Sequence, residues 1–311
     1  MVFSGTDIQK ILDEVVMQSR AFTDGSVANY IPELARVDPE RVSAAIMRLD
    51  GQAYFAGDAD HVFTLQSVAK TVVLIGLMEE YGARTLFSWI SAEPSGSAFS
   101  SIAELDRLGT TPSNPMINAG AIALCSRIPG DTEQRAKWLD KWVEKCFGKT
   151  LYVNESVYQS ERVTGNRNRS IAYLLKSNDV LPLEVEDALN TYYRLCSYEA
   201  DVTTMAYLPM LLANGGRNAQ GRQIFSQSTC SKVVAIMATC GLYDESGMYL
   251  VHTGLPAKSG ISGAIIAVST GRAGIAVCSP RVNAKGGSVR GHYILQQLSD
   301  KLGWHFASLD E

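Results

Sequence analysis

The chain has 311 residues, of which 46% are hydrophobic and 19% are charged, so it can bury a sizeable core and has an ordinary soluble composition. Its formal net charge is −4, and its lysines and arginines are scattered along the sequence. Because a phosphate backbone is bound by a basic face, we expect no nucleic-acid partner.

Neither a membrane span nor an export signal is apparent in the sequence. The longest apolar run, residues 71–78, is far too short to cross a bilayer. The first ten residues, "MVFSGTDIQK", lack the basic stretch and apolar core of a signal peptide. We therefore expect a cytoplasmic protein with no membrane partner.

The spacing of cysteines and histidines predicts no metal motif. No two of the six cysteines have metal-ligand or redox spacing, and several lie in apolar segments, so we expect reduced structural thiols. The four histidines are too dispersed for a zinc motif, and no Gly-x-Ser-x-Gly elbow is present to use one as a base.

In chain order, the first predicted elements are a helix and a hairpin. Residues 7–20 have helical spacing. Residues 41–58 then alternate toward Asp50-Gly51 and resume as a second apolar strand, which is typical of a tight hairpin. From Ser67 to about Cys240 the pattern is mostly helical and is interrupted by short runs of Gly, Pro, Asn and Ser.

Strand character returns near the C-terminus. The segments 258–269 and 273–280 have the character of strands and are joined by a turn at residues 270–272, and residues 288–303 are expected to form an amphipathic helix. We expect a mixed α/β (α+β) fold in which strands from both chain ends form one antiparallel sheet flanked by the terminal helices. The chain would be a single domain with an α/β lobe (about 1–70 and 240–311) and an inserted helical lobe (about 71–239).

Ser67 and Lys70 are the first candidate catalytic pair. They lie three residues apart in a predicted helix over 67–82, which puts both on one face about one turn apart. A neutral, buried Lys70 could take the proton of Ser67 as its oxygen attacks a carbonyl carbon. The motif alone is weak, because chance predicts about one Ser-x-x-Lys in such a chain. The alternative is that Ser67 caps the helix and that Lys70 extends its stem over apolar surface with its charge in water.

A second lysine motif strengthens the catalytic interpretation. Lys258-Ser259-Gly260 precedes the apolar strand beyond the helical block. Serine hydrolases of the penicillin-recognising kind have this order, and their Lys-Thr/Ser-Gly strand faces the nucleophile and supplies half of the oxyanion hole. The alternative for residues 258–260 is an ordinary turn into a strand.

Six further motifs, in the same order, resemble the glutaminase family of bacteria and animals. They are "VANYIPELA" (27–35), "FTLQSVAK" (63–70), "NPMINAGAI" (114–122), "SERVTGNRNRSIAYLLKS" (160–177), "MATCGLYDESG" (237–247) and "GLPAKSGISG" (254–263). The resemblance implies a β-lactamase-like fold and a serine-dependent hydrolysis of L-glutamine. It also implies a homodimer or homotetramer.

The resemblance further implies roles for individual residues. Glu161 would pair with the α-ammonium of glutamine, and Tyr30, Asn118 and Asn168 would bind the α-carboxylate and neighbouring polar atoms. The reacting end would be lined by Gln66, Tyr192 and Tyr243, with the backbone of Ile261 as oxyanion donor opposite the N–H of Ser67. Other readings are a solvated helix charge for Glu161, helix caps for the two asparagines and core aromatics for the tyrosines.

The mechanism implied by these residues is an amide hydrolysis in two steps. Lys70, directly or through Tyr243, accepts the proton of Ser67, and a glutamyl ester forms and is hydrolysed, with release of ammonia and glutamate. This chemistry requires no metal and no organic cofactor. Two other functions compete with it: a β-lactamase or penicillin-binding enzyme, and a glutamine-binding module without catalysis.

The chain departs from the usual family pattern at two places. Ser262 and Ala264 stand where the family usually has glycines after Lys-Ser-Gly, and added side chains there would narrow the cleft or restrain its backbone. Asn283 and Gly287 stand where Asp and Asn are more frequent. We expect these changes to affect efficiency and substrate range rather than the class of reaction.

Overall fold

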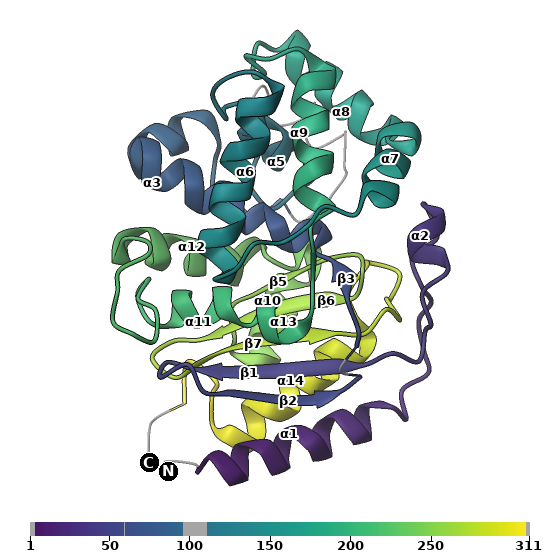
Figure 1. The fold of residues 1–311 in the computed structure, drawn as a ribbon, viewed down its shortest axis with the longest axis vertical. Helices are drawn as coiled ribbons and strands as arrows, with labels where there is room; N and C mark the ends of the chain where they lie inside the picture. The colour runs from purple at the N-terminus through teal and green to yellow at the C-terminus, as the bar shows by residue number, and fades with distance from the viewer. Residues whose placement is uncertain (1–3, 59, 96–110, 309–311) are drawn as a thin grey trace.

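A five-stranded antiparallel sheet forms the centre of the lower half of the molecule, with helices on both of its faces (Figure 1). The computed structural model describes residues 4–58, 60–95 and 111–308. The strand order is β2-β1-β7-β6-β5. The strands are β1 (Ser43–Arg48), β2 (Ala53–Gly57), β5 (Ala257–Ser259), β6 (Ala264–Ser269) and β7 (Ala273–Cys278).

The two chain ends meet in this sheet, as the sequence predicts. Strand β1 pairs with β7 in a register that runs from Ser43 opposite Cys278 to Arg48 opposite Ala273. The hairpin at Asp50-Gly51 is also confirmed, because β1 and β2 are antiparallel neighbours and Gly51 has the positive φ of +86° that its turn requires.

The segment 258–269, predicted as one strand, is two strands joined by a tight turn at residues 260–263. Strands β5 and β6 pair antiparallel, and the N–H of Gly263 donates to the carbonyl oxygen of Gly260 at 2.9 Å. Gly263 has a φ of +89°, and a Cβ there would lie only 2.0 Å from the carbonyl oxygen of Ser279. The sequence prediction joins the two strands across this turn, although glycine and serine are typical turn residues, because buried strand residues stand on both sides of it.

Each face of the sheet is covered by helices. The terminal helices α1 (Gly5–Ser19) and α14 (Val289–Leu302) pack against each other and against the sheet, as predicted, around Leu12 and Leu298. The short helices α10 (Val202–Met205) and α11 (Tyr207–Ala213) contact β1 and β7 and belong to the other core cluster, which extends into the helical half.

The middle of the chain is mostly helical, as predicted. Its helices are α3 (Lys70–Trp89), α5 (Asn118–Cys125), α6 (Thr132–Phe147), α7 (Glu155–Thr164), α8 (Asn166–Ser177), α9 (Val185–Cys196) and α12 (Gln227–Cys240), and outside this block lie α2 (Pro32–Ala35) and α13 (Ser246–Thr253). The sequence did not indicate the two-residue strands β3 (Phe63–Thr64) and β4 (Glu199–Ala200), which pair with each other. The lobe boundaries stay a prediction.

Two further expectations from the sequence concern the cysteines and a membrane span. All six cysteines are free and buried, as expected of structural thiols. Among the described residues, the structure has no helix with both the length and the apolar character that a membrane span needs.

Arg290, in helix α14, forms hydrogen bonds with the segment between α1 and β1. It is fully buried, and its guanidinium donates to the carbonyl oxygens of Phe22 and Glu40 at 2.8 and 3.2 Å and to Glu40 Oε2 at 2.7 Å. We expect Arg290→Ala to lower the free energy of unfolding by about 3 kcal/mol, because these buried acceptors lose their donor. Urea unfolding measures the change.

The control for this prediction is Arg48→Ala, which removes a partly exposed arginine paired with Asp50 at 3.6 Å. It should change the free energy of unfolding by less than about 0.5 kcal/mol. Equal effects of the two substitutions would contradict the structural role of Arg290.

Candidate active site

Ser67 lies in a short 3-10 helix, η1 (Gln66–Ala69), directly before α3. The sequence prediction that the α-helix begins at Ser67 is therefore wrong by three residues. Gln66 has a φ of +48°, which is unusual for a residue with a side chain. Such backbone strain is found mainly at functional sites, where the surrounding fold holds it. The fold thus holds Ser67, which is half-buried, next to a strained residue.

Lys70 is fully buried at the start of α3 and has no carboxylate partner among the described residues. Its Nζ donates to the carbonyl oxygen of Met116 at 3.0 Å and to Asn118 Oδ1 at 2.7 Å. Burial lowers the pKa of Lys70 from 10.5 to about 7. A neutral amine has two N–H groups, which these two acceptors satisfy, and one lone pair, which remains available. The alternative interpretation, in which the charged end of Lys70 extends into water, is wrong because the side chain is fully buried.

Tyr243 connects Ser67 with the second lysine motif. Its hydroxyl forms a hydrogen bond with the side chain of Ser67 and accepts one from Lys258 Nζ at 3.1 Å. Lys258 is fully buried and also donates to the carbonyl oxygens of Gly241 and Ser259, at 3.0 and 2.6 Å. Burial and the nearby charge of Lys70 lower the pKa of Lys258. The site thus contains two buried lysines.

The contact between Lys258 and Tyr243 was missed from the sequence. The Lys258-Ser259-Gly260 motif pointed to the strand, but nothing in the spacing indicated which side chain the lysine would meet. Tyr243 itself has a φ of +59°, so a second strained residue lies in this cluster.

Asn118 connects Lys70 with the helices above it. Its Nδ2 donates to Asn168 Oδ1 at 2.9 Å, and its Oδ1 accepts from the hydroxyl of Tyr192 at 3.3 Å. The helix-cap interpretation of Asn118 and Asn168 is wrong, because the N-caps of α5 and α8 are Ile117 and Gly165. The two asparagines instead form a buried polar network with the lysine.

Glu161 forms a third polar contact group with Tyr30 and Gln66. The hydroxyl of Tyr30 lies 2.6 Å from Glu161 Oε1 and 3.3 Å from Gln66 Oε1. Glu161 is only 6% exposed, so the interpretation as a solvated helix charge is wrong. Burial raises the pKa of Glu161, and hydrogen bonds from Tyr30 and Gln66 oppose the shift. A cation placed beside this carboxylate would gain a desolvated partner.

The turn at residues 260–263 lies close to the backbone of Ser67. A Cβ on Gly260 would lie 2.7 Å from the carbonyl oxygen of Leu65 and 3.5 Å from the backbone nitrogen of Ser67. Glycine is required here for this close approach. Ile261, the predicted oxyanion donor, follows directly in the chain.

Most of the predicted residues belong to one of three hydrogen-bond groups, which contain Tyr243 with Lys258, Lys70 with Asn118, and Glu161 with Tyr30. Ser67 precedes a buried amine by one turn and lies next to the close backbone approach at Gly260. Together with a desolvated carboxylate, this arrangement is suited to acyl transfer on a substrate that carries an ammonium group.

Comparison with known proteins identifies the family. The family model described as Glutaminase matches residues 25–306. The chain belongs to the glutaminase family. The glutaminase of Legionella pneumophila (strain Lens) is 52% identical over 300 residues, which cover 96% of this chain and 97% of the relative. Glutaminase 2 of Clostridium perfringens is 37% identical, with 95% and 98% covered. This glutaminase is a hydrolase that acts on glutamine, so the penicillin-recognising alternative is not favoured.

Solved structures of glutaminases share the fold. The probable glutaminase ybaS has a TM-score of 0.94 and 33% identity, with 98% of this chain and 99% of that chain covered. The probable glutaminase from Bacillus subtilis, complexed with 6-diazo-5-oxo-L-norleucine, has a TM-score of 0.88 and 30% identity, with 98% of both chains covered. The predicted β-lactamase-like fold is confirmed.

Proposed function

We propose that this glutaminase hydrolyses the side-chain amide of L-glutamine with Ser67 as nucleophile, Lys70 as base and a glutamyl ester as intermediate. The observation that carries the proposal is Lys70, a buried amine with a lowered pKa one turn after Ser67. A lysine in this state is available as a base near neutral pH, which an exposed lysine is not.

In the first step, Lys70 accepts the proton of Ser67, directly or through Tyr243, and the serine oxygen attacks the δ-carbon of glutamine. The C–N bond then breaks, the nitrogen takes that proton from Lys70 or Tyr243, and ammonia leaves. Water hydrolyses the ester to glutamate in the second step, with the same groups moving the proton.

Lys258 acts in this scheme as a positioning residue for Tyr243. By donating to the phenol oxygen at 3.1 Å, it favours the orientation in which the O–H of Tyr243 points toward Ser67. It also stabilises negative charge on that oxygen while the proton is in transit.

The oxyanion would be bound by the backbone N–H groups of Ser67 and Ile261. The close approach of Gly260 to the backbone nitrogen of Ser67 supports this arrangement. Two donors from different segments, fixed before the reaction, stabilise the developing charge without reorganisation.

The substrate would be held by its charged end. Glu161 pairs with the α-ammonium, Tyr30, Asn118 and Asn168 bind the carboxylate and neighbouring polar atoms, and Gln66 and Tyr192 line the reacting end. The burial of Glu161 supports the ammonium role. A relative with a TM-score of 0.92 and 31% identity was solved in its glutamate form, which supports glutamate as the product.

The experiment that tests the nucleophile is labelling with 6-diazo-5-oxo-L-norleucine, the compound in the complex of the Bacillus subtilis relative. This diazoketone analogue of glutamine alkylates a nucleophile and loses N₂. We expect one label per chain on the peptide that contains Ser67, no label on Ser67→Ala, and an unchanged label on Ser88→Ala, an exposed serine that serves as the matched control. A label on any other residue would assign the nucleophile elsewhere.

The oligomeric state and cellular location stay predictions. The family resemblance predicts a homodimer or homotetramer, and light scattering of the purified protein tests this oligomeric state. The sequence predicts a cytoplasmic location.

A further inference from the structure

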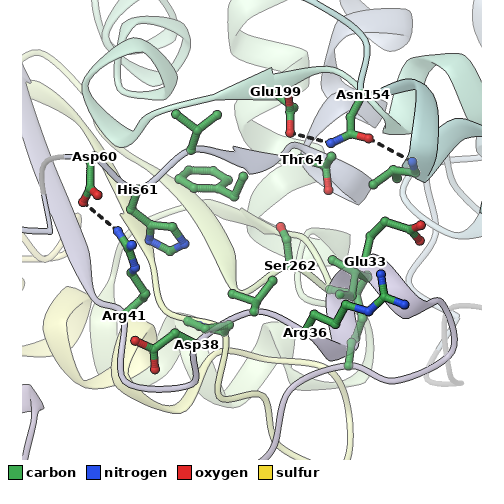
Figure 2. Close-up of a pocket in the computed structure, with 18 residues that line it drawn as sticks. Glu33, Arg36, Asp38, Arg41, Asp60, His61, Thr64, Asn154, Glu199 and Ser262 are labelled. Carbon is green, nitrogen blue, oxygen red and sulfur yellow. Dashed lines mark hydrogen bonds and ion pairs between the residues drawn. The ribbon is translucent and has the colours of Figure 1, made fainter.

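We propose that a pocket beside the catalytic cluster, here called the side pocket, binds a small organic ammonium ion that acts as an effector of turnover. The side pocket has a volume of about 460 Å³ and lies between α2, β3, the start of α7 and the turn at residues 260–263 (Figure 2). Its lining includes Glu33, Arg36, Ser262 and an apolar wall that contains Leu34 and Val37.

Two polar groups in the lining lack partners within the described part of the chain. Ser262 is 6% exposed, and its Oγ is buried without a hydrogen-bond partner. Figure 2 shows its hydroxyl oxygen directed into the space that the labelled residues surround. Glu33 has one carboxylate oxygen, Oε2, in the same buried and unpartnered state. Since native proteins leave few buried polar atoms unsatisfied, the carboxylate oxygen of Glu33 indicates a missing donor, and the hydroxyl of Ser262 can accept a hydrogen bond from the same donor group.

The charges of the lining favour a cation. Four carboxylates and two guanidinium groups line the side pocket, which is a balance of two negative charges. Arg41 is already paired with Asp60 at 2.6 Å, and Arg36 is exposed to solvent. His61 adds no charge at neutral pH, because burial lowers its pKa below 6.5. An ammonium group supplies the N–H donors that Glu33 and Ser262 lack, and the apolar wall accommodates an alkyl chain.

The side pocket adjoins the site proposed for glutamine but has a different lining, although Glu33 lies near enough to add to the rise that burial causes in the pKa of Glu161. Of the residues assigned above to catalysis or substrate binding, only Ile261 lines it. Ile261 and Ser262 are neighbours in the tight turn that Gly263 closes on Gly260. A ligand bound to Ser262 therefore acts on the backbone that carries the proposed oxyanion donor, so its effect should fall on kcat more than on KM. Only this kinetic consequence rests on the proposed function.

The binding test uses three probes with the same alkyl body: n-butylammonium, butyrate and n-butanol. Isothermal titration calorimetry should show binding of n-butylammonium to the full chain and much weaker binding of the other two. Glu33→Gln and Ser262→Ala should each weaken n-butylammonium binding by about tenfold, whereas Glu133→Gln, an exposed helix carboxylate outside the side pocket, should not. Preference for butyrate, or equal binding to all four proteins, would overturn the proposal.

The kinetic test distinguishes the side pocket from the ammonium subsite at Glu161. Saturating n-butylammonium should change kcat at saturating glutamine, and Glu33→Gln and Ser262→Ala should abolish this change at the same probe concentration. An increase in KM alone, removed by excess glutamine, would place the probe at Glu161 and overturn the proposal. If the protein proves to have no turnover on glutamine, the calorimetric test still decides binding.

Discussion

Ser67→Ala is expected to lower kcat for L-glutamine by about 10³-fold or more, because the proposed mechanism forms the glutamyl ester on the hydroxyl oxygen of Ser67. Ammonia and glutamate release from the purified protein measures this loss, with L-asparagine as competing substrate. The variant should keep its affinity for L-glutamate, since the proposed contacts with the amino-acid end do not involve the hydroxyl of Ser67. Calorimetry with glutamate checks that the site remains folded.

Two outcomes would change the proposal for Ser67. Turnover that survives in Ser67→Ala would remove this residue as nucleophile. Glutamate binding without ammonia release by either protein would instead support the glutamine-binding module. Ser88→Ala, an exposed serine whose Oγ donates to the carbonyl oxygen of Thr85, is a control that should retain full turnover.

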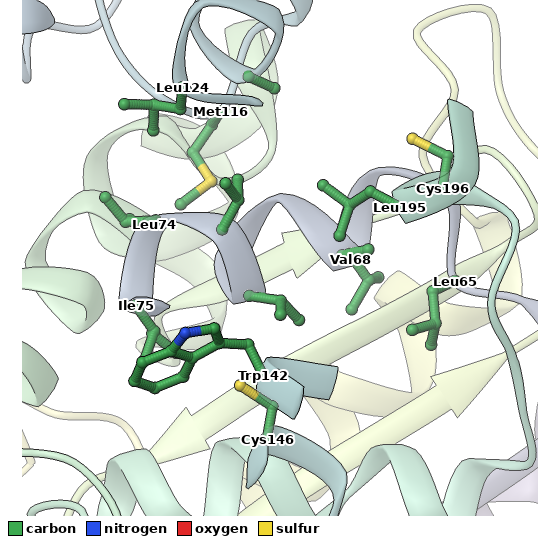
Figure 3. Packing of buried hydrophobic residues seen from close by; sticks show 14 of the residues in the cluster. Leu65, Val68, Leu74, Ile75, Met116, Leu124, Trp142, Cys146, Leu195 and Cys196 are labelled. Carbon is green, nitrogen blue, oxygen red and sulfur yellow. The ribbon is translucent and has the colours of Figure 1, made fainter. Parts of the chain in front are cut away.

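Lys70→Met should lower kcat/KM by about 10³-fold and abolish its dependence on a group of pKa near 7. The segment around Lys70 is apolar: Val68 and Leu74 belong to the same core cluster as Met116 and Leu195 (Figure 3). These surroundings make the charged amine unfavourable, which lowers the pKa of Lys70 to about 7. Methionine has a similar length and no charge, so the cluster can stay packed.

The pH profile of the unmodified protein should show whether kcat/KM rises or falls as Lys70 loses its proton. The base is active when it is neutral, so kcat/KM should be low below pH 7 and rise to a plateau above it as Lys70 loses its proton. Lys258→Met should lower the plateau value of kcat/KM, because Tyr243 loses the donor that orients its hydroxyl. The rise of kcat/KM near pH 7 should remain. If Lys258→Met loses the rise and Lys70→Met keeps it, Lys258 is the base.

Sequence reasoning was most successful where function depends on residue type and order. The Ser67-Lys70 spacing, the second lysine motif and the family motifs named the residues that the structure brings together. It failed where backbone conformation departs from regular periodicity. The 3-10 helix at Gln66 directly precedes an apolar helical run, and periodicity does not distinguish a 3-10 turn from the first turn of an α-helix. The turn at residues 260–263 was assigned to the following strand although two of its four residues are glycines.

The sequence by itself determined the pairing of the chain ends, the hairpin at Asp50-Gly51 and the family, and it named the candidate catalytic side chains, because alternation, turn residues and motifs are properties of the sequence alone. Only the tertiary structure decided that Lys70 is buried with a lowered pKa, that Tyr243 meets Lys258, and that Ser262 faces a pocket. These properties arise where distant segments exclude water from one another, and desolvation and long-range hydrogen bonds have no signal in the order of neighbouring residues.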